Sequence, residues 1–284
     1  MMLLSLRQCH NTIQHVGQRS SSTLRRNALT GNWTIFATGR TSRPKQTAST
    51  KKSSQADHPP HVDTCPFCTG KEHKTPPELL RVNDSKGEWS LRVIPNAFPA
   101  VSAPSPEWQE EWRRSNEKKK SSTSYTGKVN EEREAIGFHE VVVETPVHNL
   151  VLAEQDPEYM KRILLAWRTR GRALYDNEPS LQSILYFKNN GSVAGASLIH
   201  PHSQIVGLPL VPRDAAGRQR AHLQYYERYG RSVWETSLEE ELTQREMFPD
   251  HHRIVDQNEH FIAFVCCNIY NFLQFFLSFY IFTI

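Results

Sequence analysis

The sequence predicts an α+β fold with an antiparallel sheet, and three observations lead to that class. Segments with strand character follow one another through short connections, segments with helical character come in runs, and no internal repeat is present. The chain has 284 residues, of which 38% are hydrophobic, so it is long enough for one large domain or two small ones with a buried core.

Strands are expected where β-branched and aromatic residues cluster or alternate with polar ones. The first is expected over 33–38, and a polar loop follows it up to residue 62. A second strand is expected over 88–94, and a buried one over 137–145, where Val141, Val142 and Val143 follow one another. Three more are expected over 181–187, 197–208 and 261–265.

The clearest helix is expected over 156–175, because Asp156 can cap its N-terminus and Pro157 fits the first turn. Its buried face is expected to consist of the apolar residues at helical spacing, namely Met160, Ile163, Leu164, Trp167, Leu174 and Tyr175. Two more helices are expected over 213–229 and 232–247. By contrast, residues 103–135 are highly charged and are expected to form a mobile surface loop.

Composition excludes several classes of protein. The 34 Lys and Arg against 30 Asp and Glu leave a net charge of +4, too small an excess to argue for nucleic acid binding. Charged residues make up 23% of the chain, which excludes a polytopic membrane protein. Five cysteines (9, 65, 68, 266 and 267) make a poor disulfide framework for this length. A reducing compartment, here the cytoplasm, and a metal site fit them better.

Both ends of the chain have unusual composition. Residues 1–26 are cationic, rich in hydroxyl groups and free of acids, as in a mitochondrial or plastid transit peptide, although a disordered extension explains them equally well. Residues 261–284 carry no charge and contain seven Phe, which is long enough to span a bilayer. Polar residues interrupt this run and no Lys or Arg flanks it, which argues against a membrane span. Composition changes abruptly near Cys266, so sequence read past a splice junction is a further explanation.

The motif Cys65-Pro66-Phe67-Cys68 leaves three interpretations open. Two thiolates at this spacing can hold one tetrahedral zinc if two further ligands come from elsewhere. A redox pair is disfavoured, because a loop with Pro59 and Pro60 precedes the motif where a strand should stand. The third interpretation is a pair of surface thiols.

The motif His200-Pro201-His202-Ser203-Gln204 follows the Gly-punctuated turn 191–197. In a strand, His200, His202 and Gln204 point to the same face, beside a turn whose backbone N–H groups could approach a phosphate. Two structural histidines in a polar strand would be the ordinary interpretation of such a pair. The turn before the motif and the amide after it favour a phosphate-handling site instead.

Together these stretches resemble the galactose-1-phosphate uridylyltransferases of the histidine-triad superfamily. The resemblance runs from Leu24 to Val265 and includes, in order, residues 29–33 with Arg40, the CxxC, residues 92–100, 137–141 and 146–148, the His-Pro-His-Ser-Gln motif and residues 259–264. It implies a histidine-triad-like antiparallel sheet with flanking helices. It also implies a place in galactose and carbohydrate metabolism, a nucleotide sugar and a sugar 1-phosphate as partners, and a homodimer for a complete chain.

By this resemblance, UMP moves from UDP-glucose to galactose 1-phosphate through a covalent nucleotidyl-histidine on His202. A nucleotide-sugar phosphorylase that uses the same histidine is the alternative activity, and an inactive zinc-binding fragment is a further one. The resemblance makes Cys65, Cys68, His148 and His200 the ligands of a structural zinc. It assigns substrate contacts to Arg40, Asn96, Asn189, Gly195, Ser197 and Gln204. Hydrolases of the superfamily carry a third His at position 204; an amide cannot give up a proton, so Gln204 favours transfer over hydrolysis.

Three departures from the family pattern modify this expectation. Ser232 and Glu235 stand where plant-type ADP-glucose phosphorylases and many bacterial members carry a second CxxC, so a second zinc site is not expected. Arg218 aligns near the iron-ligating Glu of some members, so an iron site is not expected either. After Val265 the family continues with a second histidine-triad-like half, which the Phe-rich tail replaces here, and this departure favours sequence read past a splice junction over a membrane anchor. The expected organisation is therefore an extension over 1–23, a catalytic domain over 24–230, the start of a second, related half over 231–265, and an aberrant hydrophobic tail over 266–284.

Overall fold

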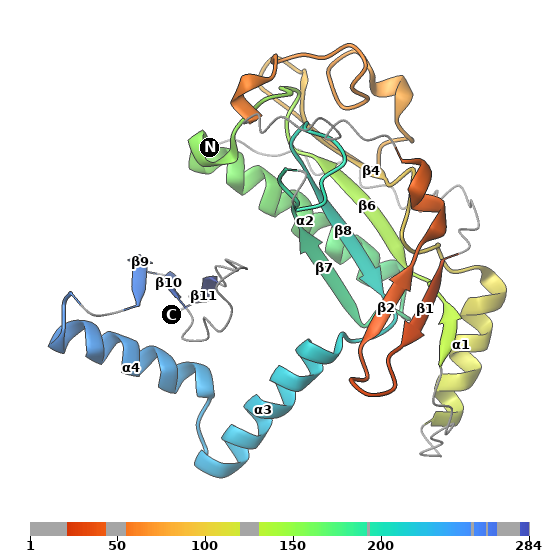
Figure 1. The fold of residues 1–284 in the computed structure, drawn as a ribbon. Coiled ribbons are helices and arrows are strands. Elements are labelled where there is room, and N and C mark those ends of the chain that lie inside the picture. Colours follow the sequence, from red (N-terminus) through yellow and green to blue (C-terminus); the bar gives the residue numbers. More distant parts are fainter. Residues whose placement is uncertain are drawn as a thin grey trace. The chain divides into compact units, whose positions relative to one another are not determined.

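The computed structural model describes residues 22–43, 55–119, 131–191, 194–250, 253–259, 261–265 and 279–283 (Figure 1). The predicted N-terminal extension lies outside these residues, apart from Ser22 and Thr23. The chain divides into two compact units, residues 1–213 and 214–284. The α+β class is confirmed, because antiparallel sheets and helices occur together in one chain.

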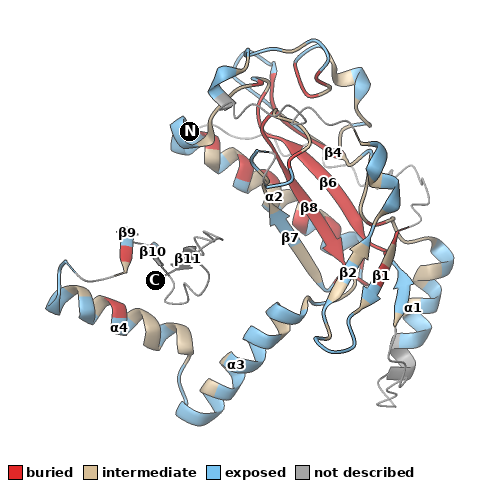
Figure 2. Cartoon of the chain, viewed as in Figure 1, coloured by how far each residue is buried: buried red, intermediate tan, exposed pale blue. Residues whose placement is uncertain are grey.

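The first unit is built on a five-stranded antiparallel sheet. Its order is β3 (Leu80–Asn83), β4 (Trp89–Pro95), β6 (Phe138–Val143), β8 (His202–Leu208) and β7 (Ser183–Phe187). Figure 2 shows that β4, β6 and β8 are the buried strands of this sheet. The β-branched run of β6 was the sequence signal for that strand, and alternation was the signal for β4. The inner position of β6 and β8 explains why both are buried on both faces.

Helix α2 (Pro157–Asn177) covers one face of this sheet. It begins as the sequence predicts, since the side chain of Asp156 accepts a hydrogen bond from Tyr159 N at 2.8 Å. Ile163 and Leu174 pack against Leu91, Val93, Phe138, Val142 and Ile205 of the sheet.

The predicted face of α2 was too wide. Leu164 is 52% exposed and Tyr175 is 47% exposed, because each lies about 100° around the helix from its buried neighbour, Ile163 or Leu174. Gly171, which the sequence did not single out, is buried instead. A Cβ on it would lie 1.9 Å from Tyr186 Oη, so a larger residue here would displace the Tyr186 side chain of β7.

The opposite face of the sheet is covered by loop segments and a second, small sheet. The small sheet has the order β2 (Trp33–Phe36), β1 (Thr23–Arg26), β5 (Glu132–Glu134) and is antiparallel. Leu24 of β1 packs on Val206 and Leu208 of β8. Beside it, the loop with Cys65 and Cys68 packs on Ile94, Val141 and Val143. Between β2 and this loop lie the short 3-10 helices η1 (Thr38–Ser42) and η2 (Gln55–Asp57); η3 (Glu72–Lys74) follows the loop and η4 (Leu152–Glu154) precedes α2.

The prediction of a loop over 103–135 was wrong for most of its described residues. Helix α1 (Pro106–Lys119) occupies its first half, and β5 pairs with β1 at its end. The charged composition masked a helix-start signal, in which Ser105 Oγ accepts from Trp108 N at 3.2 Å and proline stands first in the helix. Gln109 Nε2 donates to Glu178 Oε2 at 2.6 Å, which ties α1 to the residue that follows α2.

The second unit contains α3 (Arg213–Tyr229), whose first residue belongs to the first unit, and α4 (Val233–Met247). Its strands β9 (Ile254–Gln257), β10 (Phe261–Val265) and β11 (Phe279–Thr283) form an antiparallel sheet with β10 in the centre. Residues 279–283 of the predicted tail are thus paired with β10, while 266–278 lie outside the described residues. Among the described residues, no helix is long and apolar enough to cross a bilayer.

Gly137→Ala is expected to destabilise the first unit, because a Cβ at this position would lie 2.2 Å from the backbone oxygen of Gly207 on β8. The β6–β8 pairing would have to shift, at a cost of about 1–3 kcal/mol in the free energy of unfolding. Urea unfolding of the variant measures this change in the free energy of unfolding. Gly39→Ala is the matched control, since nothing lies within 4 Å of its Cβ position. Equal stability of the two variants would contradict this account of the β6–β8 contact.

Candidate functional site

Two cysteines and two histidines from three separate segments lie close together on the face of the five-stranded sheet opposite α2. Cys65 and Cys68 come from the loop before η3, His148 from the loop after β6, and His200 from the residues just before β8. All four are buried, and one ligand atom from each lies within 4.8 Å of the others. These four residues could therefore hold a metal ion. The burial of both thiols rules out a pair of surface cysteines.

The spacing of these atoms suits a tetrahedral ion. The Nδ1 atom of His148 lies 3.4 Å from Cys68 Sγ, and the Nδ1 atom of His200 lies 3.6 Å from Cys68 Sγ and 3.7 Å from Cys65 Sγ. Zinc–sulfur bonds of about 2.3 Å and zinc–nitrogen bonds of about 2.0–2.1 Å imply sulfur–nitrogen edges of about 3.6 Å in a tetrahedron. The group is thus compatible with zinc.

Hydrogen bonding prepares His200 for such a role. Its Nε2–H donates to the backbone oxygen of Thr145 at 2.7 Å, which leaves Nδ1 unprotonated and facing the thiols. Burial lowers the pKa of His200 to about 3, so the ring is neutral at pH 7. Burial raises the pKa of the Cys65 thiol to about 11, so it stays protonated until a cation stabilises the thiolate.

His202 lies two residues further along, at the start of β8. It is buried, and the edge of its ring contacts Phe67, with ring centroids 5.6 Å apart. Its Nδ1 lies 2.8 Å from the backbone oxygen of His200. A carbonyl oxygen only accepts, so Nδ1 carries the proton and Nε2 keeps a free lone pair. Burial lowers the pKa of His202 and so favours the neutral ring. The hydrogen bond to the His200 carbonyl and the charge of Glu144 oppose this shift, while the charge of Lys188 adds to it.

Three of the predicted substrate-binding side chains lie close together on the same face of the sheet as His202. Gln204 Oε1 lies 2.8 Å from His139 Nε2, and Asn96 Nδ2 lies 3.0 Å from the same nitrogen. Arg40, from η1, donates from Nη1 to the backbone oxygen of Phe98 at 2.6 Å, two residues from Asn96. Burial lowers the pKa of Arg40.

The other three predicted substrate-binding residues lie in the loop between β7 and β8. Gly195 has a φ of +81°, and its backbone oxygen lies 3.5 Å from Arg43 Nη2. The amide nitrogen of Asn189 is 3.9 Å from the position that a Cβ on Gly195 would take. Ser197 is half-buried. None of the hydrogen bonds between described residues joins Asn189, Gly195 or Ser197 to the group around Gln204.

Sequence reasoning missed two groups beside the site. His139 lies between Gln204 and Asn96, and the alternation of β6, which places it on the face of Val141 and Val143, was the available signal. Lys188 Nζ pairs with the buried carboxylate of Glu144 at 2.5 Å and lies 3.5 Å from the backbone oxygen of His202. This second group had no sequence signal, since its members are 44 residues apart.

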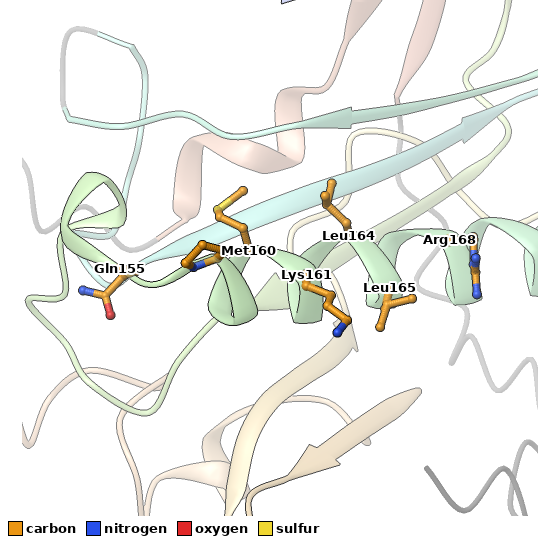
Figure 3. A pocket seen from close by; sticks show the side chains of 7 residues that line it. Gln155, Met160, Lys161, Leu164, Leu165 and Arg168 are labelled. Carbon is orange, nitrogen blue, oxygen red and sulfur yellow. The ribbon is translucent and has the colours of Figure 1, made fainter. Parts of the chain in front are cut away.

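A cavity of about 560 Å³ opens on α2, which packs on the other face of the sheet (Figure 3). Figure 3 shows Met160, Leu164, Lys161, Leu165 and Arg168 spread along the helix around it. Its lining is mostly apolar and includes no histidine or cysteine. It is therefore separate from the candidate site around His202.

The N-terminal domain of galactose-1-phosphate uridyl transferase matches residues 11–212 of the chain. An ADP-glucose phosphorylase from Arabidopsis thaliana is 33% identical over 87% of this chain and 62% of its own length. A galactose-1-phosphate uridylyltransferase from Thermotoga maritima is 28% identical over 85% of this chain and 61% of its own length.

Solved structures agree with these sequence matches. A uridylyltransferase structure has a TM-score of 0.53 at 25% identity, over 85% of this chain and 60% of its own. A GalT-like protein from Arabidopsis thaliana has a TM-score of 0.50 at 30% identity, over 84% of this chain and 61% of its own. The chain thus spans about three fifths of the length of these relatives.

Proposed function

Because the chain belongs to the galactose-1-phosphate uridylyltransferase family, we propose that His202 takes a nucleotidyl group from a nucleotide sugar and passes it to a second acceptor. The observation that carries this proposal is the hydrogen bond from His202 Nδ1–H to the backbone oxygen of His200. It leaves the Nε2 lone pair free to attack, on the same face as the Gln204 amide. A neutral imidazole is a good nucleophile near pH 7.

In the first step, Nε2 attacks the α-phosphorus and forms a P–N bond, while the P–O bond to the sugar 1-phosphate breaks and the sugar 1-phosphate leaves. The proton stays on Nδ1, so the ring becomes positively charged beside the carbonyl oxygen of His200 that already accepts from it. In the second step, a phosphate oxygen of the acceptor attacks the same phosphorus. The P–N bond then breaks, and the neutral ring is restored.

The remaining site residues are proposed to hold the substrate. Gln204, Asn189, Ser197 and the backbone at Gly195 would bind the phosphates, and Arg40 and Asn96 would contact the nucleotide sugar. Gly195 has a positive φ, and this backbone conformation would let its N–H approach a phosphate closely.

We also propose that the ion held by Cys65, Cys68, His148 and His200 is zinc with a structural role. Four protein ligands leave no open coordination position for catalysis. When bound, zinc would fasten the Cys65–Cys68 loop to the start of β8. His200 is two residues from the nucleophile, so this attachment also fixes the backbone oxygen that orients His202.

Two acceptors are candidates for the second step. Transfer of UMP from UDP-glucose to galactose 1-phosphate is proposed as the first candidate reaction, since a relative that the chain matches is named galactose-1-phosphate uridylyltransferase. Phosphorolysis of ADP-glucose is favoured by the higher identity, 33% against 28%, to the Arabidopsis phosphorylase. Residues 231–265 are proposed to begin the second half of the family fold, and a complete chain is proposed to act as a homodimer in the cytoplasm.

The test is to incubate the chain either with UDP-glucose and galactose 1-phosphate or with ADP-glucose and inorganic phosphate. Formation of UDP-galactose in the first mixture identifies a uridylyltransferase. Formation of ADP and glucose 1-phosphate in the second mixture identifies a phosphorylase. Release of no glucose 1-phosphate from either nucleotide sugar would contradict the proposed function.

Gln204→Ala is expected to slow nucleotidyl transfer by roughly 10²–10³, because it removes one hydrogen-bond donor to the phosphoryl group in the transition state. The covalent adduct should still form, since His202 is unchanged. Rapid-quench measurement of adduct formation checks the rate. An unchanged rate in this variant would remove Gln204 from the phosphate site.

A further inference from the structure

His139 is a buried imidazole whose protonation can be worked out from its neighbours. The backbone N–H of Ala100 donates to its Nδ1 at 2.9 Å, so Nδ1 carries no proton. Burial lowers the pKa of His139 to about 4, so the ring is neutral at pH 7 and has a single N–H. That proton is therefore on Nε2, which makes Nε2 a donor.

Two amides lie within reach of this donor, and only one of them presents an acceptor. The backbone N–H of Phe98 donates to Asn96 Oδ1 at 2.9 Å, which turns the amide nitrogen of Asn96 toward His139. That nitrogen is itself a donor and cannot take the proton. Gln204 Oε1, at 2.8 Å, can accept it. The hydrogen bond from His139 to Gln204 thus follows from two backbone N–H groups in the segment between β4 and α1.

We propose that His139 is a positioning residue that sets which end of the Gln204 amide faces the substrate. With Oε1 held by the imidazole N–H, the NH₂ group of Gln204 is left for the face that it shares with His202. Without His139, the amide would be free to rotate by 180° and present its oxygen to a phosphate, where two acceptors repel. This inference rests on the proposed function, in which Gln204 donates to the transferring phosphoryl group.

Nitrogen-15 NMR of the wild-type chain tests the geometry without any need for activity. Once the His139 ring is assigned through its own backbone, the expected spectrum has a protonated Nε2, an unprotonated Nδ1 and a contact from the Nε2 proton to the Gln204 side chain. A ring protonated at Nδ1 would overturn the proposal. Because this result does not depend on turnover, it stands apart from a failure of the proposed function, which would appear as wild-type protein that forms no adduct.

A double-mutant cycle tests the positioning role itself. His139→Leu is expected to slow adduct formation by about 10- to 100-fold, no more than Gln204→Ala does, since it acts only through that amide. The double variant should then be no slower than Gln204→Ala alone. His139→Gln, whose side-chain nitrogen can replace Nε2–H, should recover part of the rate. His73→Leu removes an exposed imidazole from η3 and should leave the rate unchanged. If the rate reductions caused by His139→Leu and Gln204→Ala multiply in the double variant, the two residues act independently and the proposal is overturned.

Discussion

Cys65→Ser is expected to lower the zinc content from about one ion per chain to well below that value and to destabilise the first unit. Structural zinc contributes about 10–16 kcal/mol of binding free energy in small zinc domains, and this energy is available only to the folded state. Here the ion would hold a loop and the start of β8 together through four buried ligands. Elemental analysis and thermal unfolding of the variant measure both effects.

Cys9→Ser is the matched control for that experiment, because it removes a thiol that is not one of the four clustered residues. It should leave the zinc content and the unfolding temperature unchanged. A chelator should act on wild-type protein as Cys65→Ser does. Full zinc occupancy in Cys65→Ser would show that the ion is held elsewhere.

His202→Gly is expected to abolish the covalent nucleotidyl adduct and to leave the metal in place. The variant removes the nitrogen that attacks phosphorus, while all four clustered residues stay unchanged. His200 cannot replace it, because its Nε2–H is bonded to Thr145 and its Nδ1 faces the thiols. Protein incubated with a nucleotide sugar labelled in the α-phosphate, then separated from free nucleotide, gives the measurement.

Added imidazole provides the complementary experiment for His202→Gly. A small base that enters the vacated space should restore part of the transfer, whereas it should do nothing for Cys65→Ser. Unchanged zinc in His202→Gly serves as the check that the fold is intact. Label that still accumulates on this variant would move the nucleophile to another residue.

The central strands and the main helix could be predicted because their signals are local. The run Val141–Val143 and the pair Asp156 and Pro157 dictate a buried strand and a helix start within a few residues. Strands such as β5 could not be predicted, because all three residues of Glu132–Glu134 are exposed and form a strand only through pairing with β1, more than a hundred residues earlier. The sequence did not predict helix α1, because the high charge of residues 103–135 indicated a loop although Ser105 and Pro106 formed a helix-start signal.

In the candidate site, too, some residues could be found from local sequence patterns and others could not. The CxxC spacing gave two of the four clustered residues, whereas the other two came from the family resemblance, since His148 and His200 lie 80 and 132 residues from Cys68. The alternation of β8 placed His202 and Gln204 on one face. The state of His139 depends on the backbone N–H of Ala100, 39 residues away, and only a folded structure supplies that contact.

The most direct test of the account is the location of the nucleotide on the chain. Wild-type protein is incubated with a nucleotide sugar and digested with trypsin at alkaline pH, where a phosphoramidate is stable. Cleavage after Lys188 and Arg213 releases residues 189–213, which contain both His200 and His202. We expect fragmentation of this peptide by mass spectrometry to place the nucleotidyl mass on His202. The same mass on His200, or on any peptide outside 189–213, would contradict it.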